Sequence, residues 1–447
     1  MTDRGRESLS ALNRNNRVSQ SGTELGAFLM RILVLTINYW PEDTGIGAYS
    51  TARCEYLASQ GHKVTVCTGM PYYPEWKIRD AYRGRMFCNE THNDVNIMRS
   101  YLYVPRRVTS VRRVFHEASY TAMSLGNALR QQRPDVIIVI SPPLPQAVSG
   151  ILLSWRWKVP YIFHVEDLQP DAAGELGMLP KPVLKVLRGL EKFAYQQAAL
   201  VSTLTEPMAQ RIVSKGIPSE KVAIFPHWAD PALFDVPVAG GGRTFRESLQ
   251  LGDGHFVVLH SGNMGVKQGL DVVIEAAALS RDDHRTVFLL VGDGAARPSL
   301  EKQAAAANLD NVRFMPLQPR EVFYDMLAGA DVTLITQQRT VSDIVFPSKT
   351  VSLLAAGRPI IGSLRSDSEV ARVLEASRGG LVVPPEDPSA LFGAIGSLRN
   401  DARELRLMGE RGRAYARQRW DRSRILPQME HRLEQAIATA GSGAQAA

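Results

Sequence analysis

A glycine-rich loop is the stretch of this chain whose residue types and spacing most clearly suggest chemistry. It joins an apolar, β-branched run, residues 256–259, to an apolar segment with helical spacing, residues 270–277. Gly262 and Gly265 allow backbone N–H groups to approach a ligand closely, and the start of a helix adds about half a positive charge. Lys267 lies in the same loop. Together these features favour a phosphate-binding site, although a glycine-rich turn with a solvated lysine has the same pattern.

A second lysine stands at the start of another predicted helix, residues 350–356. Pro347 is suited to the opening of that helix, because the N–H that proline lacks needs no partner there. The amino end of the helix is then free to bind an anion, with Lys349 in its first turn. We therefore expect Lys267 and Lys349 to flank one diphosphate. The alternative is a capped helix with a solvated lysine.

Ionisable residues cluster just beyond a third predicted strand, residues 161–163. His164, Glu166 and Asp167 follow that strand directly. Open α/β sheets bind ligands outside the carboxyl ends of their strands, so we expect function here. Either Glu166 or Asp167 would orient an acceptor hydroxyl or act as a base. A histidine in this position is otherwise a structural group with satisfied hydrogen bonds.

A further glycine loop follows the first predicted strand, residues 32–37. Gly45 and Gly47 begin a pattern that half resembles the dinucleotide fingerprint Gly-X-Gly-X-X-Gly, but its third glycine is replaced by Ser50. The second strand also ends in Cys-Thr-Gly rather than in an acid that would bind a ribose. We therefore expect no NAD site. A phosphate or sugar contact at these glycines remains open, as does a tight turn.

The elements that must position these residues alternate between strand and helix in both halves of the chain. A Pro- and Gly-rich stretch, residues 236–242, separates the halves. The pattern predicts an α/β fold of two doubly wound, Rossmann-like domains that face a cleft. A long aromatic segment, residues 70–93, is read as an irregular loop that forms part of an acceptor pocket. The predicted parts are a disordered extension 1–29, an acceptor-side domain 30–230 with a returning helix 420–437, a nucleotide-sugar domain 231–419 and a disordered tail 438–447.

Composition excludes several classes of protein. No apolar run in the 447 residues approaches the roughly 18 that a spanning helix needs. Three scattered cysteines suit a reducing cytosol without structural zinc, and the first 29 residues lack the apolar core of a signal peptide. The net charge of +7 suggests an anionic partner. Nucleic acid is disfavoured because no helix-turn-helix, zinc finger or aromatic-basic sheet pattern is present.

Much of the positive charge lies in a segment that also carries exposed-type apolar residues, 99–115. Such a mixture suits either an anionic membrane surface or an ordinary solvated face. The residues predicted to meet a membrane are Arg106, Arg107, Arg112 and Arg113.

The chain resembles the GT-B glycosyltransferases of family 4, and within them the branch typified by WcaI and WbuB. Four motifs in order carry the resemblance: Asn-Tyr-Trp-Pro-Glu at 38–42, Gly-Asn-Met-Gly at 262–265, Phe-Pro-Ser-Lys at 346–349 and Ala-Ala-Gly-Arg-Pro at 355–359. The resemblance implies a retaining transfer of a fucose- or N-acetylfucosamine-like sugar from a GDP- or UDP-linked donor. It implies no metal and no other cofactor. The implied acceptor is a polyprenyl-diphosphate-linked saccharide at the cytoplasmic face of the membrane.

The family's functional positions are carried over one at a time. The strand-end histidine that meets the donor sugar falls on His164, and the first glycine loop falls near the donor phosphates. The arginine of the phosphate-binding pair is replaced by Asn263, so Lys349 is expected to supply the missing charge. Two glutamates eight apart in many members fall on Ile344 and Ser352, for which Asp343 and Ser352 are partial substitutes.

The resulting prediction has two sets of residues. The catalytic set is His164, Lys267, Lys349, Glu166 and Asp167. The donor-binding set is Gly45, Gly47, Gly262, Asn263, Gly265, Gly292, Asp293, Gly294, Gln318, Asp343, Ser348 and Ser352. A nucleotide-sugar epimerase on the same fold, and a non-catalytic nucleotide-sugar-binding protein, are the alternatives.

Overall fold

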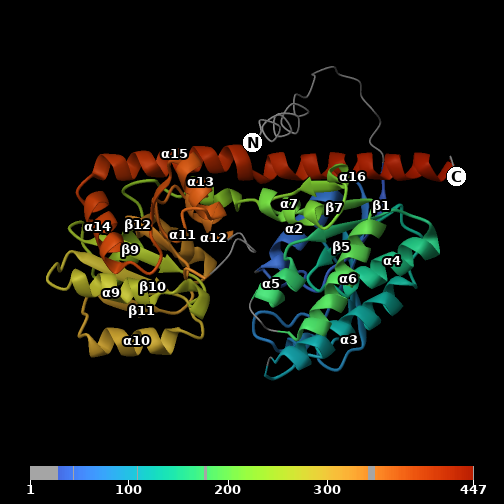
Figure 1. Cartoon of the computed structure of the whole chain (residues 1–447), viewed down its shortest axis with the longest axis horizontal. Coiled ribbons are helices and arrows are strands. Elements are labelled where there is room, and N and C mark those ends of the chain that lie inside the picture. The colour runs from blue at the N-terminus through green and yellow to red at the C-terminus, as the bar shows by residue number, and fades with distance from the viewer. Residues whose placement is uncertain (1–28, 44, 108, 176–178, 341–347, 446–447) are drawn as a thin grey trace, which may run out of the picture.

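The computed structural model describes residues 29–43, 45–107, 109–175, 179–340 and 348–445. Two sheets, each covered by helices on both faces, lie side by side (Figure 1). The first sheet is built from residues before Phe225 and the second from residues after His255. The predicted α/β fold of two doubly wound domains is therefore confirmed. No helix in the described ranges combines the length and the apolar content needed to cross a bilayer.

The N-terminal sheet has the strand order β3-β4-β2-β1-β5-β6-β7-β8, and every neighbouring pair is parallel except β3 with β4. Central strands such as β5 are buried along their whole length, because helices cover both of their faces. The strands are β1 Arg31–Leu35, β2 Lys63–Gly69, β3 Phe87–His92, β4 Val95–Ser100, β5 Val136–Ser141, β6 Tyr161–Val165, β7 Leu200–Thr203 and β8 Val222–Ile224.

Alternating residues of these strands enter two separate cores. One face of the sheet packs against α4, α6 and α7, and the other packs against α2 and α16. This side-to-side alternation is the ordinary period of a strand. The helices of this half are α2 Ile46–Ser59, α3 Ser110–Ala128, α4 Gln146–Trp157, α5 Gln169–Glu175, α6 Lys181–Gln197 and α7 Glu206–Ser214, with short 3₁₀ turns η1 Asp80–Tyr82, η2 Ser219–Lys221 and η3 Pro231–Asp235.

The C-terminal sheet is parallel throughout, with the order β11-β10-β9-β12-β13-β14. Its order reverses between β9 and β12, and ligands of open parallel sheets bind outside the carboxyl ends of strands at such a point. Its strands are β9 Phe256–Ser261, β10 Thr286–Val291, β11 Val312–Met315, β12 Val332–Thr336, β13 Ile360–Ser363 and β14 Gly380–Val383. Its helices are α8 Arg243–Ser248, α9 Asp271–Leu279, α10 Arg297–Ala306, α11 Arg320–Gly329, α12 Ser348–Ala355, α13 Glu369–Ser377, α14 Pro388–Arg399 and α15 Ala402–Trp420, with the 3₁₀ turn η4 Val266–Gln268.

The last helix, α16 (Arg422–Gln445), returns to the N-terminal domain. α15 and α16 lie end to end along one edge of both domains, drawn in red in Figure 1. Ile425, Leu426, Met429 and Leu433 of α16 are buried in the core that also holds β1 and α2. Where α15 ends, the N–H of Ala229 donates to the carbonyl of Trp420 (2.9 Å), so the two crossings of the chain between the domains run side by side.

Two sequence-based predictions about local structure are wrong. Residues 70–93 are not irregular throughout, because η1 and the antiparallel strand β3 lie within them. α16 continues to Gln445, past residue 438, where a disordered tail was expected to begin. Residues 1–28 of the predicted disordered extension lie outside the described part of the chain.

Candidate active site

Two glycine loops interlock at the carboxyl ends of β9 and β10. The N–H of Gly262 donates to the carbonyl of Val291 (2.8 Å), and the N–H of Met264 donates to the carbonyl of Asp293 (2.8 Å). Gly292 has φ +142°, and a Cβ there would collide with the Gly262 carbonyl oxygen. Gly294 has φ +155°, and a Cβ there would collide with the carbonyl oxygen of Met264. These glycines are therefore required for the packing of one loop on the other, as well as for any approach of a ligand.

Lys349 brings a positive charge to this pair of loops from the first turn of α12. A Cβ placed on Gly262 would lie 3.3 Å from Lys349 Nζ, so the ammonium packs directly on the backbone of that glycine. Burial alone lowers the pKa of Lys349 to about 8. Lys349 is half-buried, and no carboxylate in the described ranges offsets this cost, so its ammonium has no counter-charge there.

The glycine loop does not lead directly into α9, as the sequence suggested. The turn η4, which carries Lys267, and then Gly269 with φ +56°, come between the loop and Asp271, the first residue of α9. Lys267 is exposed, unlike Lys349. The expected contribution of the α9 helix end to anion binding is therefore not supported, because an acidic side chain occupies its first turn.

Asp167 connects this loop to the N-terminal domain. Burial raises the pKa of the Asp167 carboxyl, while the positive charges of Arg113 and Lys267 act in the opposite direction. Lys267 belongs to the C-terminal domain, so the Asp167 carboxyl is within reach of a charge from that domain. One oxygen of Asp167, Oδ1, is buried without a hydrogen-bond partner in the described structure. Asp167 is thus a partly buried carboxyl of the N-terminal domain that lies within reach of a charge on the C-terminal domain.

His164 lies inside β6 rather than beyond it, since the strand continues to Val165. Its Nε2 lies 3.0 Å from Nη2 of Arg53, and its Nδ1 lies 2.9 Å from Oγ of Ser202. Because a guanidinium only donates, Nε2 must accept and Nδ1–H must donate. Burial and the Arg53 charge lower the pKa of His164 to about 4. Both ring nitrogens therefore have partners within the N-terminal domain, whereas the family resemblance implies a contact with the donor sugar.

Glu166 is buried in the same cluster. Its Oε1 lies 3.5 Å from His164 Nε2 and 3.8 Å from Arg53 Nη2, and its Oε2 lies 3.6 Å from His227 Nε2. Burial raises the pKa of the Glu166 carboxyl, but its polar neighbours, His227 among them, more than offset that effect, so the pKa is lower than usual. Both carboxylate oxygens, Nε and Nη1 of Arg53, and Nε2 of His227 lack well-formed hydrogen bonds in the described structure. Such a cluster of unsatisfied buried polar atoms is uncommon and marks a candidate for function.

An aromatic pocket of about 300 Å³ lies at the same end of the N-terminal sheet. The aromatic segment after β2 does line it, as predicted. Glu42 holds that segment in place: its Oε1 accepts from the N–H groups of Tyr72 and Tyr73 (both 2.7 Å), and its Oε2 accepts from Asn38 Nδ2 (2.8 Å). The lining residues are Ile37, Asn38, Gly45, Ile46, Tyr72, Tyr73, Trp76, Arg113, His116, Glu117, Pro142 and Pro143.

The first glycine loop has one residue in this pocket. Gly45, with φ +56°, begins α2 and lines the pocket. Gly47 is instead buried, and a Cβ there would lie 2.6 Å from the carbonyl oxygen of Glu42. A tight turn therefore accounts for Gly47, whereas the predicted ligand contact at Gly45 stays a prediction.

The remaining predicted donor-binding residues surround the second glycine loop to different degrees. Asn263 and Asp293 are exposed on the two interlocked loops. Gln318 is half-buried, and its side-chain amide donates to the carbonyl of Pro316 (2.7 Å). Ser352 lies half-buried on α12. Asp343 lies outside the described residues, and Ser348 begins α12 without a described side chain.

Only part of the basic segment, residues 99–115, is exposed. Arg106, Arg107, Arg112 and Arg113 are exposed, but Arg99 is completely buried. The Arg99 guanidinium binds Glu90 and the carbonyls of Gly69 and Trp40. The prediction that Arg99 belongs to a surface that binds an anionic membrane is therefore wrong.

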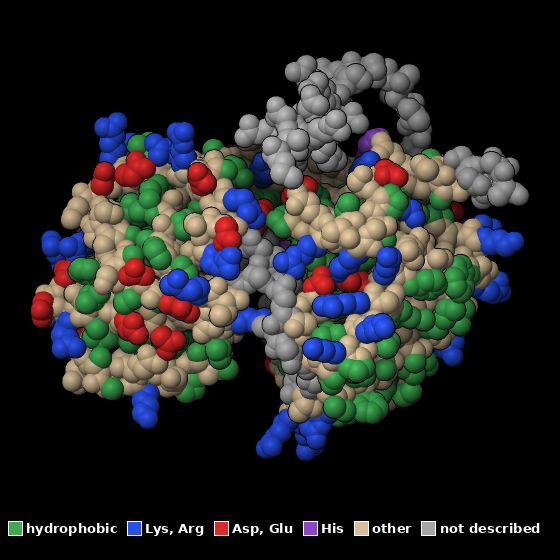
Figure 2. Space-filling model, in the orientation of Figure 1, with side chains coloured by type: hydrophobic (Ala, Val, Ile, Leu, Met, Phe, Trp, Pro, Cys, Tyr) green, Lys and Arg blue, Asp and Glu red, His purple; other side chains and the backbone are tan. Residues whose placement is uncertain are grey.

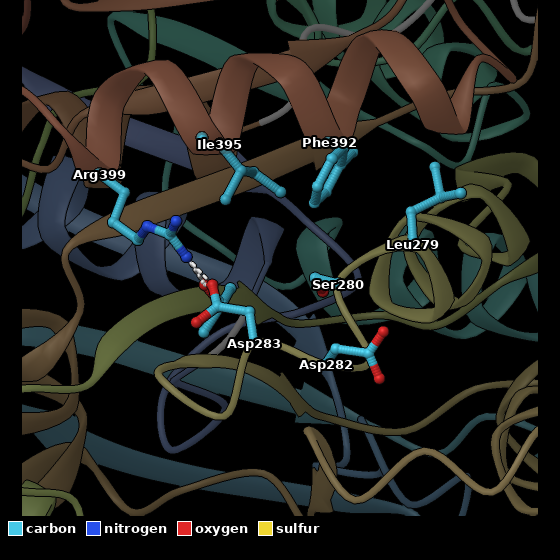
Figure 3. Close-up of a pocket in the computed structure, with 9 residues that line it drawn as sticks. Leu279, Ser280, Asp282, Asp283, Phe392, Ile395 and Arg399 are labelled. Atoms are coloured by element: carbon cyan, nitrogen blue, oxygen red, sulfur yellow. Dashed lines mark hydrogen bonds and ion pairs between the residues drawn. The ribbon is translucent and has the colours of Figure 1, made fainter.

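A second hollow of about 300 Å³ lies away from these residues (Figure 3). Phe392 and Ile395 of α14 line it opposite Leu279, and an ion pair between Arg399 and Asp283 spans one end. It lies where α9 ends and β10 begins, at the amino ends of the strands. The glycine loops are at the opposite edge of the sheet, so this hollow is not part of the candidate site. In the described part of the chain, no group of three or more His, Cys, Asp or Glu side chains is arranged to hold a metal ion.

Sequence reasoning missed Arg53, His227 and Glu42. An arginine in the middle of a predicted helix is normally solvated, and nothing in its spacing indicated that Arg53 faces β6. His227 follows the last strand of the sheet and stacks on Tyr49 with ring centroids 3.7 Å apart. Its position beyond a strand end was the same signal that singled out His164.

Two Rossmann-like domains whose glycine loops and lysines meet at the strand ends define a GT-B glycosyltransferase. The sequence comparisons agree: residues 44–228 match the family described as glycosyl transferase 4-like domain, and residues 255–401 match glycosyl transferases group 1. The chain belongs to this family of glycosyltransferases. It is 34% identical over 406 residues to the putative colanic acid biosynthesis glycosyl transferase WcaI of Escherichia coli K12, covering 89% of this chain and 98% of that protein. The predicted WcaI-like relationship is confirmed.

Solved structures show the same fold at low sequence identity. The sucrose-phosphate synthase of Thermosynechococcus elongatus has a TM-score of 0.70 at 17% identity, over 92% of this chain and 99% of that one. HepE of Anabaena, solved with UDP, has a TM-score of 0.67 at 16% identity, over 91% of this chain and 100% of that one.

Proposed function

We propose that this glycosyltransferase moves a fucose- or N-acetylfucosamine-like sugar, with retention, from a GDP- or UDP-linked donor to a lipid-linked saccharide during exopolysaccharide assembly. The observation that carries the proposal is the buried ammonium of Lys349 against the backbone of Gly262. A diphosphate oxygen is the partner that such a cation lacks. The similarity to WcaI, a putative colanic acid glycosyl transferase, supports the pathway class, and the fold shared with UDP-bound HepE supports a nucleotide-linked donor.

The donor's diphosphate would lie over the interlocked glycine loops. Lys349 would bind it on the side of Gly262, and the exposed Lys267 would bind it on the side nearer Asp167. Both charges stabilise the nucleoside diphosphate as it leaves, which is the main demand of the reaction. The proposal assigns this task to lysines and requires neither a metal nor another cofactor.

In the reaction, the bond from the anomeric carbon to the diphosphate oxygen breaks, and a bond from that carbon to the acceptor oxygen forms. Retention requires the acceptor hydroxyl to approach on the face that the diphosphate leaves. The hydroxyl proton then passes to a phosphate oxygen of the leaving group. Asp167 suits the role of orienting that hydroxyl better than Glu166, because the low pKa of Glu166 makes its carboxylate a weak base.

The acceptor would enter through the aromatic pocket beside Asn38 and Tyr72. Aromatic faces bind the apolar faces of sugar rings, and Arg113 in the wall provides a charge for an acceptor diphosphate. The exposed arginines Arg106, Arg107 and Arg112 would face anionic lipid at the cytoplasmic surface of the membrane.

The experiment is a thermal-shift series with UDP, GDP and their sugars in the presence of a metal chelator, followed by turnover with lipid-linked saccharides. We expect stabilisation by one nucleotide class, and at least about tenfold lower turnover in Lys349→Ala with the fold intact. Free nucleotide should appear only when acceptor is added. Nucleotide-sugar conversion without acceptor would indicate an epimerase, and donor binding without turnover on any acceptor would indicate a binding protein.

A further inference from the structure

An apolar stripe runs along the outer side of α3. Val111, Val114 and Phe115 are 61–66% exposed, and Leu129, the residue that follows the helix, is 52% exposed. Ala118 and Ala122 continue the stripe between them. The spacing of three or four residues places these side chains on one face of the helix. The N-terminal sheet lies behind the opposite face, so this stripe has no partner within the described chain.

The neighbouring helices extend the stripe into a broad surface. On α4 the exposed residues Val148, Leu152 and Trp155 recur at helical spacing. On α6, Val186 is 71% exposed, and Phe193 makes an edge contact with the Trp155 ring at 6.4 Å between centroids. We call the outward sides of α3, α4 and α6 the apolar face. Figure 2 shows hydrophobic side chains gathered over the part of the N-terminal domain where Figure 1 places these helices.

The charges on this face all have one sign. Of the acids on the three helices, Glu117 is half-buried and pairs with Arg113, and Glu191 is buried and pairs with Lys215. No other acid occurs in α3, α4 or α6. The exposed cations on or beside the helices include Arg112, Arg113, Arg130, Arg156, Lys158, Lys181, Lys185, Arg188 and Lys192.

We propose that the apolar face is the seat of the protein on an anionic lipid bilayer. Wide apolar surfaces are rare on proteins that remain free in water, so this one needs an occupant. A rim of lysine and arginine without acids is complementary to anionic headgroups, and Trp, Phe, Leu and Val between them reach the acyl boundary. A protein partner of mixed charge has no such match with this face. The surface is far wider than the arginine segment before α3.

The position of the face gives it a role in catalysis, and this step rests on the proposed function. Arg113, His116 and Glu117 line the aromatic pocket from the inner side of α3, while Val114 and Phe115 project from its outer side. A protein seated through the apolar face therefore holds the acceptor pocket within one helix diameter of the lipid surface. A lipid-linked acceptor would reach the pocket without leaving the bilayer.

Flotation of the full-length protein with vesicles tests the proposal. Vesicles of phosphatidylcholine alone are compared with equimolar phosphatidylcholine and phosphatidylglycerol. The wild type should float with the mixed vesicles and bind the neutral ones more weakly. Trp155→Glu with Val186→Glu should reduce partitioning onto the mixed vesicles by about tenfold or more, because two apolar side chains that would insert into the lipid are lost. Lys185→Gln with Arg188→Gln and Lys192→Gln should remove most of the preference for anionic lipid.

The matched control is Val213→Glu with Leu279→Glu, which changes the net charge equally at exposed positions on α7 and α9. It should float like the wild type. Failure of the wild type to bind mixed vesicles, or equal binding by both double variants, would overturn the proposal. So would a wild-type dimer in sedimentation equilibrium that Trp155→Glu with Val186→Glu dissociates, since a second copy would then cover the face.

Lys349→Ala separates this proposal from the proposed function. That variant should keep full vesicle binding while losing its thermal shift with nucleotide. Loss of vesicle binding in the face variants with an unchanged nucleotide shift shows that the two sites act independently. A nucleotide shift without any vesicle binding refutes the seat alone, and vesicle binding without a nucleotide shift refutes the donor site alone.

Discussion

The guanidinium of Arg53 lies 3.0 Å from Nε2 of His164 and 3.8 Å from Oε1 of Glu166. One buried cation thus joins α2, which follows the first glycine loop, to the end of β6. Burial lowers the pKa of Arg53, and the Glu166 carboxylate opposes that effect. The arrangement keeps His164 neutral and in one tautomer, and it balances the charge of a carboxylate that has few hydrogen bonds of its own.

Replacement of Arg53 by methionine should destabilise the protein by about 3 kcal/mol or more, because it leaves Glu166 as a buried charge without a cation. Urea denaturation at neutral pH measures this. Addition of Glu166→Gln to the Arg53→Met variant should restore most of the lost stability. If the single variant is as stable as the wild type, the pair does not contribute to folding as we describe.

Donor affinity should depend on pH through Lys349. Its pKa is about 8 in the free protein, so its charge is present below pH 8 and is lost as the pH rises through that value. Binding of the nucleoside diphosphate should therefore weaken above pH 8, and this dependence should disappear in Lys349→Met. Isothermal titration at several pH values measures both. An unchanged pH dependence in the variant would place Lys349 outside the donor site.

The stability of the ligand-free protein should depend on pH through Lys349 in the opposite direction to donor affinity. Its pKa is lower in the folded protein than in the unfolded chain, so folding releases a proton and the ligand-free protein gains stability as the pH rises above 8. Below that pH the buried charge is a cost. Lys349→Met should thus raise the melting temperature of the ligand-free protein at neutral pH, whereas Lys267→Met, at an exposed position, should not.

Glu42 should control the acceptor pocket without affecting the donor. Glu42→Ala removes the acceptor of three hydrogen bonds and should cost about 3 kcal/mol of stability. Glu42→Gln retains an oxygen for the N–H groups of Tyr72 and Tyr73 and should cost much less. In steady-state kinetics the alanine variant should raise KM for the acceptor, while the nucleotide-induced thermal shift stays unchanged. A parallel loss of donor binding would contradict this assignment.

Gly292→Ala should separate the two interlocked loops. The new methyl group would meet the carbonyl of Gly262 at a backbone angle that alanine rarely adopts, at a cost of about 3 kcal/mol. Donor binding should fall with it. Gly252→Ala is the control, because a Cβ there has open space and no positive φ. Equal stability of the two variants would show that the loops adjust freely.

The sequence was most informative where apolar runs are long. β1, β9 and α9 lie close to the ranges that the sequence predicted, because each is a largely apolar segment next to clear turn residues. β3 was missed because its residues are polar and half-exposed. The turn that joins it to β4 carries positive φ at both Asn93 and Asp94, and this pair was the one available signal for a hairpin.

The candidate site was predictable in its location but not in its contacts. Glycines and lysines after strands identified the strand ends, and the structure places Lys349, Lys267 and Asp167 there. The direction of the His164 ring was not predictable, since it depends on β6 extending two residues further than expected. That extension places His164 on the same side of the sheet as Ile162, where Arg53 meets it. Long-range pairs of this kind leave no trace in local spacing.

The return of α16 has a consequence for the order in which the protein forms during synthesis. Ile425, Leu426, Met429 and Leu433 complete the core beneath β1, yet almost the whole chain must be translated before they leave the ribosome. The N-terminal domain emerges first from the ribosome, but its core is completed last. Until then α2 covers only part of that side of the sheet, and we expect nascent chains that stop before Arg422 to require a chaperone.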